Sequence, residues 1–278
     1  MTGESADDIA SAAASTVPDA FDTSVAHIAR VYNYWLGGKD NYAADRVAAE
    51  EVIAAYPTIY TSVRAQRAFL GRAVRYLVAE AGIRQFLDIG TGLPSANNTH
   101  EVAQQAAPES RVVYVDKDPI VLAHARALLA SGPGGVTAYL DADLRDTGGI
   151  LAEAARTLDF GRPVAVMLLG ILHCIPDEDD PAAIVARLMA AVPPGSYLTI
   201  THPASDVAAD KMAQSMRGYN EQARDPVTAR SHAEVCGFFE GLDLVDPGVV
   251  QLHRWRPGAR GPAAERELAN YGGVGRKP

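Results

Sequence analysis

The stretch Q-F-L-D-I-G-T-G-L-P-S, residues 85–95, decides how the rest of the chain is interpreted. Its apolar start, interrupted only by Asp88, predicts a short buried strand. Gly90 and Gly92 follow at once, and glycine permits the positive φ angles and the close backbone approach that a ligand-binding turn requires. A capped helix is expected to begin near Asn98. The stretch therefore predicts a strand, a glycine turn and a helix whose free N–H groups face a nucleotide.

The glycine turn departs from two common nucleotide-binding patterns. A dinucleotide site takes G-x-G-x-x-G, but Ser95 stands at the third glycine position. A Walker loop ends in G-K-[ST], which does not occur in the chain. The order is instead D-x-G-x-G, from Asp88 to Gly92, with Pro94 where a third glycine of the fullest form would stand.

The composition is that of an ordinary globular protein. The chain has 278 residues, of which 48% are hydrophobic and 21% charged, enough for one large core and an accessory segment. The net charge of −9, with lysines and arginines scattered along the chain, argues against nucleic acid as a partner. Two cysteines, Cys174 and Cys236, are too few to indicate a disulfide framework or a zinc site.

Neither the N-terminus nor the longest apolar run indicates secretion or a membrane span. The N-terminus lacks the basic start and apolar run of a signal peptide, and we expect residues 1–20 to be a disordered tail. The longest apolar run, residues 164–172, is too short to cross a bilayer. The expectation is a cytoplasmic protein without membrane contact.

The rest of the chain divides into a helical segment and a segment in which strands alternate with helices. Residues 21–82 carry only helical patterns, over 24–35, 43–55 and 60–81, and predict an N-terminal helical cap. From residue 83 to the end, strands alternate with helices and predict a nucleotide-binding domain built on a mainly parallel sheet. A helix is expected over 227–239, and strands over 242–245, 249–253 and 271–277 are expected to pair antiparallel at the sheet edge.

Polar residues stand where the predicted parallel strands end, which is where such sheets bind ligands. Asp116 follows Gly92 by about two dozen residues, the position of an acidic residue that receives ribose hydroxyls. The Asp143 carboxylate and the Leu144 N–H could meet an adenine edge. A solvated strand end and a turn aspartate are the structural alternatives for Asp116 and Asp143.

These motifs resemble those of a known family. The D-x-G-x-G order is similar to the first motif of class I S-adenosylmethionine-dependent methyltransferases. From about Asp22 to the end, the chain resembles one actinobacterial family of S-adenosyl methyltransferases, in the segments R-V-Y-N-Y-W-L-G-G-K-D-N-Y, R-Q-F-L-D-I-G-T-G-L-P, V-V-Y-V-D-K-D-P, D-A-D-L-R-D, P-G-S-Y-L, W-R-P and G-V-G-R-K-P. The resemblance implies a Rossmann-like sheet with an antiparallel C-terminal edge, and S-adenosylmethionine as cofactor. Acceptors in the family are largely uncharacterised.

The resemblance also implies roles for particular residues. It implies Asp88, Gly90 and Gly92 around the methionine part of the cofactor, Asp116 at the ribose, and Asp143 with Leu144 at the adenine. Lys117, next to Asp116, is also expected among the cofactor-binding residues. The methionine carboxylate needs a cation, and the N-terminal segment offers Arg30, Lys39, Arg64 and Arg67, of which Arg30 is favoured. Plain packing of an amphipathic helix is the alternative for this segment.

One candidate for a general base follows the fourth strand. Methyl transfer from a sulfonium needs a base only when the acceptor is a protonated nucleophile. His173 lies in the usual place, although a structural histidine is the alternative; His100 and His202 are weaker candidates. No motif indicates a metal site.

The sequence therefore predicts an S-adenosylmethionine-dependent methyltransferase acting on a small-molecule acceptor. Two alternatives stay open: an NAD-dependent oxidoreductase, and a non-catalytic regulatory protein that binds S-adenosylmethionine. The sequence does not assign an oligomeric state.

Overall fold

The fold is built around one mixed β-sheet. The computed structural model describes residues 22–128, 134–258 and 267–278. The predicted tail of residues 1–20 lies outside the described residues. Within them the sheet has eight strands in the order β3-β2-β1-β4-β5-β8-β6, with β7 beside β8. The parallel strands are β1 (Gln85–Ile89), β2 (Arg111–Asp116), β3 (Val136–Asp141), β4 (Ala165–Leu169) and β5 (Tyr197–Pro203). The antiparallel ones are β6 (Asp243–Leu244), β7 (Val250–Gln251) and β8 (Asn270–Arg276).

The central strands are buried on both faces. In β1, Leu87 is paired with Val113 of β2 on one side and with Val166 of β4 on the other, and every residue of β1 is buried. Such strands are apolar throughout because helices cover both faces of a parallel sheet. The chain order reverses between β1 and β4, so a crevice opens at their carboxyl ends.

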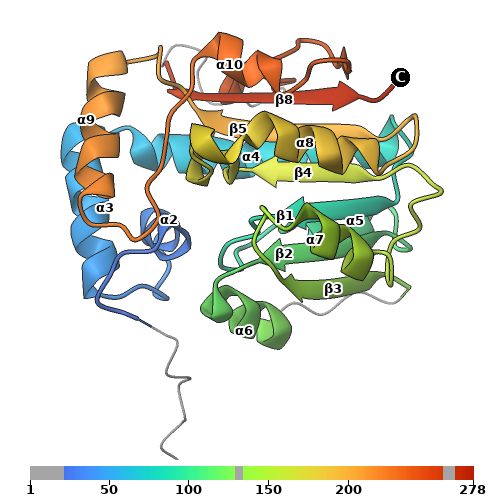
Figure 1. The fold of residues 1–278 in the computed structure, drawn as a ribbon, viewed down its shortest axis with the longest axis horizontal. Helices are drawn as coiled ribbons and strands as arrows, with labels where there is room; N and C mark the ends of the chain where they lie inside the picture. Colours follow the sequence, from blue (N-terminus) through green and yellow to red (C-terminus); the bar gives the residue numbers. More distant parts are fainter. Residues whose placement is uncertain (1–21, 129–133, 259–266) are drawn as a thin grey trace, which may run out of the picture.

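Two helical layers cover the sheet (Figure 1). On one face lie α4 (Ile59–Ala79) and α5 (Thr99–Ala106), which share an apolar cluster with Phe86 and Met167. On the other lie α7 (Thr147–Ala154), α8 (Pro181–Ala190) and α10 (His232–Gly237), which share a cluster with Leu87 and Leu168. The helix α6 (Pro119–Leu128) packs against β2 and β3.

Three further helices lie beyond the carboxyl ends of the parallel strands (Figure 1). They are α2 (Ile28–Trp35), α3 (Ala43–Ala55) and α9 (Ala209–Asn220), and together we call them the cap. Their apolar side chains form one cluster, in which Trp35 and Val52 meet Tyr219. The segment predicted as a helical cap thus has two kinds of neighbour: α2 and α3 pack with α9, whereas most of α4 packs on the sheet.

The helix predicted over residues 227–239 is wrong in its first half. Only α10 is helical, because Ser231 caps it by accepting a hydrogen bond from the Glu234 N–H. The preceding Arg230 is extended and bridges to Ala204. The strand predicted over 249–253 similarly ends at Gln251, where a short 3-10 turn (Leu252–Arg254) begins. None of the helices in the described ranges is long and apolar enough to span a membrane.

Candidate active site

A pocket lies between the carboxyl ends of β1, β2 and β4 and the cap. It is lined by the glycine turn after β1, by the strand ends, and by side chains of α2, α4 and α9. Every predicted site residue except Arg30 lines it: Asp88, Gly90, Gly92, Asp116, Lys117, Asp143, Leu144 and His173. The fold thus brings together residues that are far apart in sequence.

The glycine turn provides an open cradle at the floor of the pocket. Gly90 has a φ of +76° and Gly92 a φ of +65°, both in the region that favours glycine. A Cβ on Gly90 would lie 2.5 Å from the Ile171 Cβ, so that glycine is required by packing. A Cβ on Gly92 would meet no atom within 4 Å, because the space above it is open. A ligand can therefore approach the backbone at Gly92.

The carboxylate of Asp116 lies beside this turn. Its Oδ2 accepts a hydrogen bond from the Gly92 N–H (2.9 Å), and its Oδ1 accepts one from the Asp118 N–H (3.0 Å). Burial raises the pKa of Asp116, and these two N–H groups oppose that shift only in part. A buried, backbone-anchored carboxylate at the end of β2 is suited to accept hydrogen bonds from the hydroxyls of a ribose.

A second buried carboxylate, Asp88, lies one strand away at the end of β1. Its Oδ2 accepts a hydrogen bond from the Thr99 hydroxyl (2.6 Å), and only 5% of the residue is exposed. Burial raises the pKa of Asp88 to about 6, while the Thr99 hydroxyl and the Arg67 guanidinium act in the opposite direction. A positively charged ligand group placed there would stabilise the ionised form.

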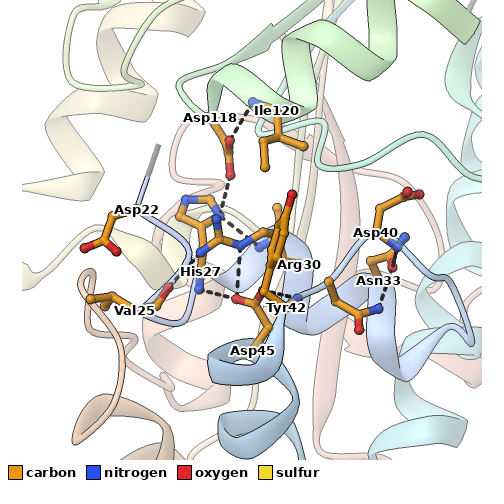
Figure 2. Close-up of polar contacts among 12 residues, drawn as sticks. Asp22, Val25, His27, Arg30, Asn33, Asp40, Tyr42, Asp45, Asp118 and Ile120 are labelled. Atoms are coloured by element: carbon orange, nitrogen blue, oxygen red, sulfur yellow. Dashed lines mark hydrogen bonds and ion pairs between the residues drawn. The ribbon is translucent and has the colours of Figure 1, made fainter. Parts of the chain in front are cut away.

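Arg30 does not line the pocket, and Figure 2 shows it beside Asp45. It is 3% exposed, its Nε donates to Asp45 Oδ1 (3.0 Å), and its Nη2 donates to the Val25 carbonyl (2.7 Å). Asp45 also accepts hydrogen bonds from the backbone N–H groups of His27 (2.9 Å) and Tyr42 (2.8 Å). Arg30 therefore fastens the start of α2 to the start of α3, and it lies apart from the pocket-lining residues, whereas the sequence predicts it beside the cofactor carboxylate.

A contact next to the Arg30–Asp45 pair connects the cap to the end of the sheet (Figure 2). The Nδ1 of His27, next to the Arg30–Asp45 pair, lies 3.0 Å from Oδ2 of Asp118 in the turn between β2 and α6. His27 lines the pocket as well. Arg30 thus acts on the pocket indirectly, by holding the segment that closes over the end of β2.

Arg67 is the arginine that α4 places at the pocket. Its Nη2 donates to the carbonyls of Ala96 (3.0 Å) and Asn97 (2.9 Å), which precede α5. Its charge also lowers the pKa of Asp88. Arg67 was among the four cations considered from the sequence, but helical periodicity could not tell which of them faces the strand ends.

Charged residues form a paired group at the end of β3. The Nζ of Lys117 lies 3.0 Å from Asp225 Oδ2 and 3.6 Å from Asp143 Oδ2. Partial burial would raise the pKa of Asp143, but the backbone N–H and guanidinium of Arg145 outweigh it and lower that pKa. Leu144 is 4% exposed and supplies an apolar wall beside them. This end of the pocket could hold an adenine through Asp143 and Leu144.

His173 also lines the pocket, from the 3-10 turn (Leu172–Cys174) after β4. It is 9% exposed, and its Nδ1 is buried without a hydrogen-bond partner among the described residues. Burial, and secondly the charge of Arg230, lower the pKa of His173 to about 4. The imidazole is therefore neutral near pH 7. The weaker candidates, His100 and His202, do not line the pocket.

Arg230, which no sequence motif marks, fixes the backbone around His173. Its guanidinium donates to the carbonyls of Leu172 (3.0 Å) and Ile175 (2.8 Å) and contacts Asp177 Oδ1 at 2.6 Å. It also lies 3.0 Å from Nε2 of His202. Arg230 is only 3% exposed, so the turn that carries His173 is held by a buried cation.

Strand order, glycine turn and acidic strand ends together define a class I S-adenosylmethionine-dependent methyltransferase. A family model described as S-adenosyl methyltransferase matches residues 14–278, so the chain belongs to that family. The predicted fold class, enzyme class and cofactor are thereby confirmed. The oxidoreductase and non-catalytic alternatives give way to this assignment.

Solved structures agree with the family assignment. A DUF574 family protein from Streptomyces avermitilis is 48% identical, with a TM-score of 0.89, and the match covers 92% of this chain and 99% of that one. A protein from Thermobifida fusca with a provisional methyltransferase description is 41% identical, with a TM-score of 0.84 and coverage of 94% and 98%. The mitomycin 7-O-methyltransferase MmcR shares the fold at 15% identity, with a TM-score of 0.51 and coverage of 93% and 74%. A comparison with curated proteins gave no match.

Proposed function

We propose that this methyltransferase acts on a small-molecule acceptor, which binds between the glycine turn and the cap with its reacting atom near His173. The observation that carries the proposal is the shape of the pocket. Acidic strand ends and an open glycine turn lie on one side of it, and a buried, neutral imidazole lies on another. The cap encloses the space between them, which favours a small molecule over a polymer.

The residues present fit the cofactor of the family. Gly92 leaves room for close backbone approach, and the Asp116 carboxylate beside it would accept hydrogen bonds from the ribose hydroxyls. Asp143 and Leu144 would meet the adenine. Asp88 would pair with the ammonium of the methionine part, and Arg67, rather than Arg30, would pair with its carboxylate. When bound, S-adenosylmethionine supplies a methyl group on a positively charged sulfur, which needs no further activation.

His173 would handle the proton of the acceptor. When an O–H or N–H acceptor forms its new bond to carbon, it must lose a proton, and the neutral imidazole can accept it. The Arg230 clamp holds the turn that carries His173, so the ring is positioned before the acceptor binds. Much of the acceleration then comes from alignment, which can supply about 7–11 kcal/mol in well-oriented reactions.

Two measurements test the proposal. Calorimetry should show that Asp116→Ala weakens S-adenosylmethionine binding by about tenfold or more, because a hydrogen bond to a charged group contributes about 1.5–3 kcal/mol. Asp141→Ala is the matched control, since Asp141 ends the neighbouring β3, is exposed and does not line the pocket. Equal affinity in the two variants would refute the ribose assignment.

The second measurement concerns the acceptor. Incubation with methyl-labelled S-adenosylmethionine and a fractionated small-molecule extract should transfer label to a small product. His173→Asn should slow that transfer while leaving cofactor binding unchanged. Label appearing only in protein or nucleic acid fractions would overturn the small-molecule assignment.

A further inference from the structure

The half of the pocket that the cap encloses is apolar. Its walls come from three elements of the cap side: Tyr32 and Trp35 of α2, Ile59 of α4, and Met212, Met216 and Tyr219 of α9. Within the described part of the chain, no pocket-lining side chain of α2, α3 or α9 carries a charge. We call this region the cap half of the pocket.

The charged residues of the pocket lie elsewhere and have partners. Lys117 is paired with Asp225 and Asp143, and the Asp88 carboxylate accepts a hydrogen bond from Thr99. These residues belong to the strand ends and the loop after α9, where the cofactor is proposed to bind. Arg67 of α4 also lines the pocket and its charge acts on Tyr32, but its guanidinium donates to the carbonyls that precede α5, and it is proposed to pair with the cofactor carboxylate. A charged acceptor in the cap half would find no counter-ion on α2, α3 or α9, and burying an unpaired charge is strongly unfavourable.

Two tyrosine hydroxyls on this side of the pocket are engaged in hydrogen bonds within the protein. The hydroxyl of Tyr32 donates to the Val63 carbonyl (3.3 Å). The hydroxyl of Tyr56, which also lines the pocket, is 3.2 Å from the Ser62 hydroxyl and accepts a hydrogen bond from the Ala269 N–H (3.0 Å). The two methionines of α9 add polarizable side chains that adapt to flat apolar ligands. Ring faces and thioethers favour an aromatic ligand.

We infer that the methyl acceptor is an uncharged, largely aromatic molecule whose single O–H or N–H group points to His173. This inference rests on the proposed function and narrows its substrate class. An acceptor of this kind buries its ring in the cap half and leaves one polar atom for the imidazole. The imidazole of His173 lines the pocket, and its buried Nδ1 has no hydrogen-bond partner among the described residues.

Three matched probes test the inference on the wild-type protein. Calorimetric titrations would use 1-naphthol, which is neutral, 1-naphthoate, which is anionic, and 1-naphthylmethylammonium, which is cationic, each with and without saturating S-adenosylhomocysteine. We expect 1-naphthol to bind at least tenfold more tightly than either charged probe. Equal or tighter binding of a charged probe would overturn the inference.

A pair of variants locates the binding. Met216→Glu places a carboxylate in the cap half and should weaken 1-naphthol binding at least tenfold, with little effect on S-adenosylhomocysteine. Gln214→Glu is the control, because Gln214 is exposed on the same helix and does not line the pocket. Unchanged 1-naphthol affinity in Met216→Glu would place the probe elsewhere and overturn the inference. If Met216→Glu does not fold, the three-probe comparison still decides.

The proposed function and the proposed acceptor class can fail separately. If S-adenosylhomocysteine does not bind the wild-type protein, the proposed function is wrong. The comparison of the naphthyl probes without it still shows whether the cap half selects uncharged aromatic ligands.

Discussion

The Oδ2 atom of Asp116, at the end of β2, accepts a hydrogen bond from the Gly92 N–H at 2.9 Å. The acidic residue proposed to bind the ribose therefore also fixes the turn that follows the neighbouring strand β1. The same turn is held from below, because the Gly90 N–H donates to the Val115 carbonyl (2.8 Å). Ligand-binding groups and backbone support are thus provided by the same strand, and the cradle is formed before any ligand arrives.

Alanine at the two glycines of this turn should have different effects. In Gly90→Ala, a residue with a φ of +76° would also place its Cβ 2.5 Å from that of Ile171. We therefore expect the free energy of unfolding to fall by about 2–5 kcal/mol. Gly92→Ala has the φ penalty alone, about 1–2 kcal/mol, but its Cβ would occupy pocket space. Urea unfolding should therefore separate the variants, while calorimetry should show reduced cofactor affinity in folded Gly92→Ala. Equal losses of stability would contradict this assignment.

Substitutions at Arg30 and Arg67 should have different effects, the first mainly on stability and the second mainly on cofactor binding. Arg30→Met leaves the fully buried Asp45 without its cation, and breaking a buried pair in this way costs about 3–5 kcal/mol. Arg67→Met should lower stability far less and weaken S-adenosylmethionine binding about tenfold or more, because a charge-assisted contact is lost. Chemical denaturation and calorimetry on both variants check the two effects. The opposite outcome, with binding lost only in Arg30→Met, would restore Arg30 as the carboxylate ligand.

Asp88 should make stability depend on pH in an unusual direction. Its pKa is raised from 3.8 to about 6 in the folded protein, so the native state holds this proton more tightly than the unfolded chain does. Its contribution to stability is present below pH 4 and is lost as the pH rises through 6. Asp88→Asn should therefore be more stable than wild type at pH 7.5, by up to about 3 kcal/mol, yet bind the cofactor less tightly.

The comparison for Asp88 must be made between variants. His173, with its pKa lowered to about 4, titrates over an overlapping range and favours stability as the pH rises from 4 to 6.5. The difference in urea midpoint between Asp88→Asn and wild type, measured at pH 4.5 and 7.5, cancels that contribution. A difference that does not grow with pH would show that Asp88 is ionised without cost in the folded protein.

Arg230 should control both the position and the protonation of His173. Arg230→Met removes the donors to the carbonyls of Leu172 and Ile175 and removes a charge that lowers the pKa of His173. We expect the pKa of His173 to rise above 4 in this variant, as followed by NMR of the imidazole. Arg230→Lys keeps the positive charge but loses the forked guanidinium, so the pKa of His173 in this variant should lie closer to its value in the wild type. An unchanged pKa in Arg230→Met would limit Arg230 to a packing role.

Much of the sheet could be predicted because its strands are marked locally. The apolar runs ending at Asp88 and Asp116 are closed by a charged residue, and parallel strands must bring those ends to one edge. This is why the glycine turn and the acidic strand ends were placed together from the sequence alone. The helix over residues 227–239 failed because helical propensity does not show where a chain bridges to another strand, as Arg230 does to Ala204.

The remaining site residues depended on contacts that a sequence does not display. Arg30 looks like any cation on an amphipathic helix, and only the fold reveals that the buried Asp45 lies opposite it. Arg230 is distant in sequence from the turn around His173 but donates a hydrogen bond to it, and no sequence motif predicts this contact. The third wall of the cap, α9, likewise joins α3 across more than 150 residues of sequence.

That shared construction of the cap has a consequence for how such proteins diversify. The helices proposed to enclose the acceptor come from segments before β1 and after β5, while the edge proposed to bind the cofactor is encoded between them. We therefore expect that replacing Met216 or Trp35 alters which compound is accepted without disturbing Asp116 or Gly92. The cap can therefore change during evolution while the edge proposed to bind the cofactor stays the same.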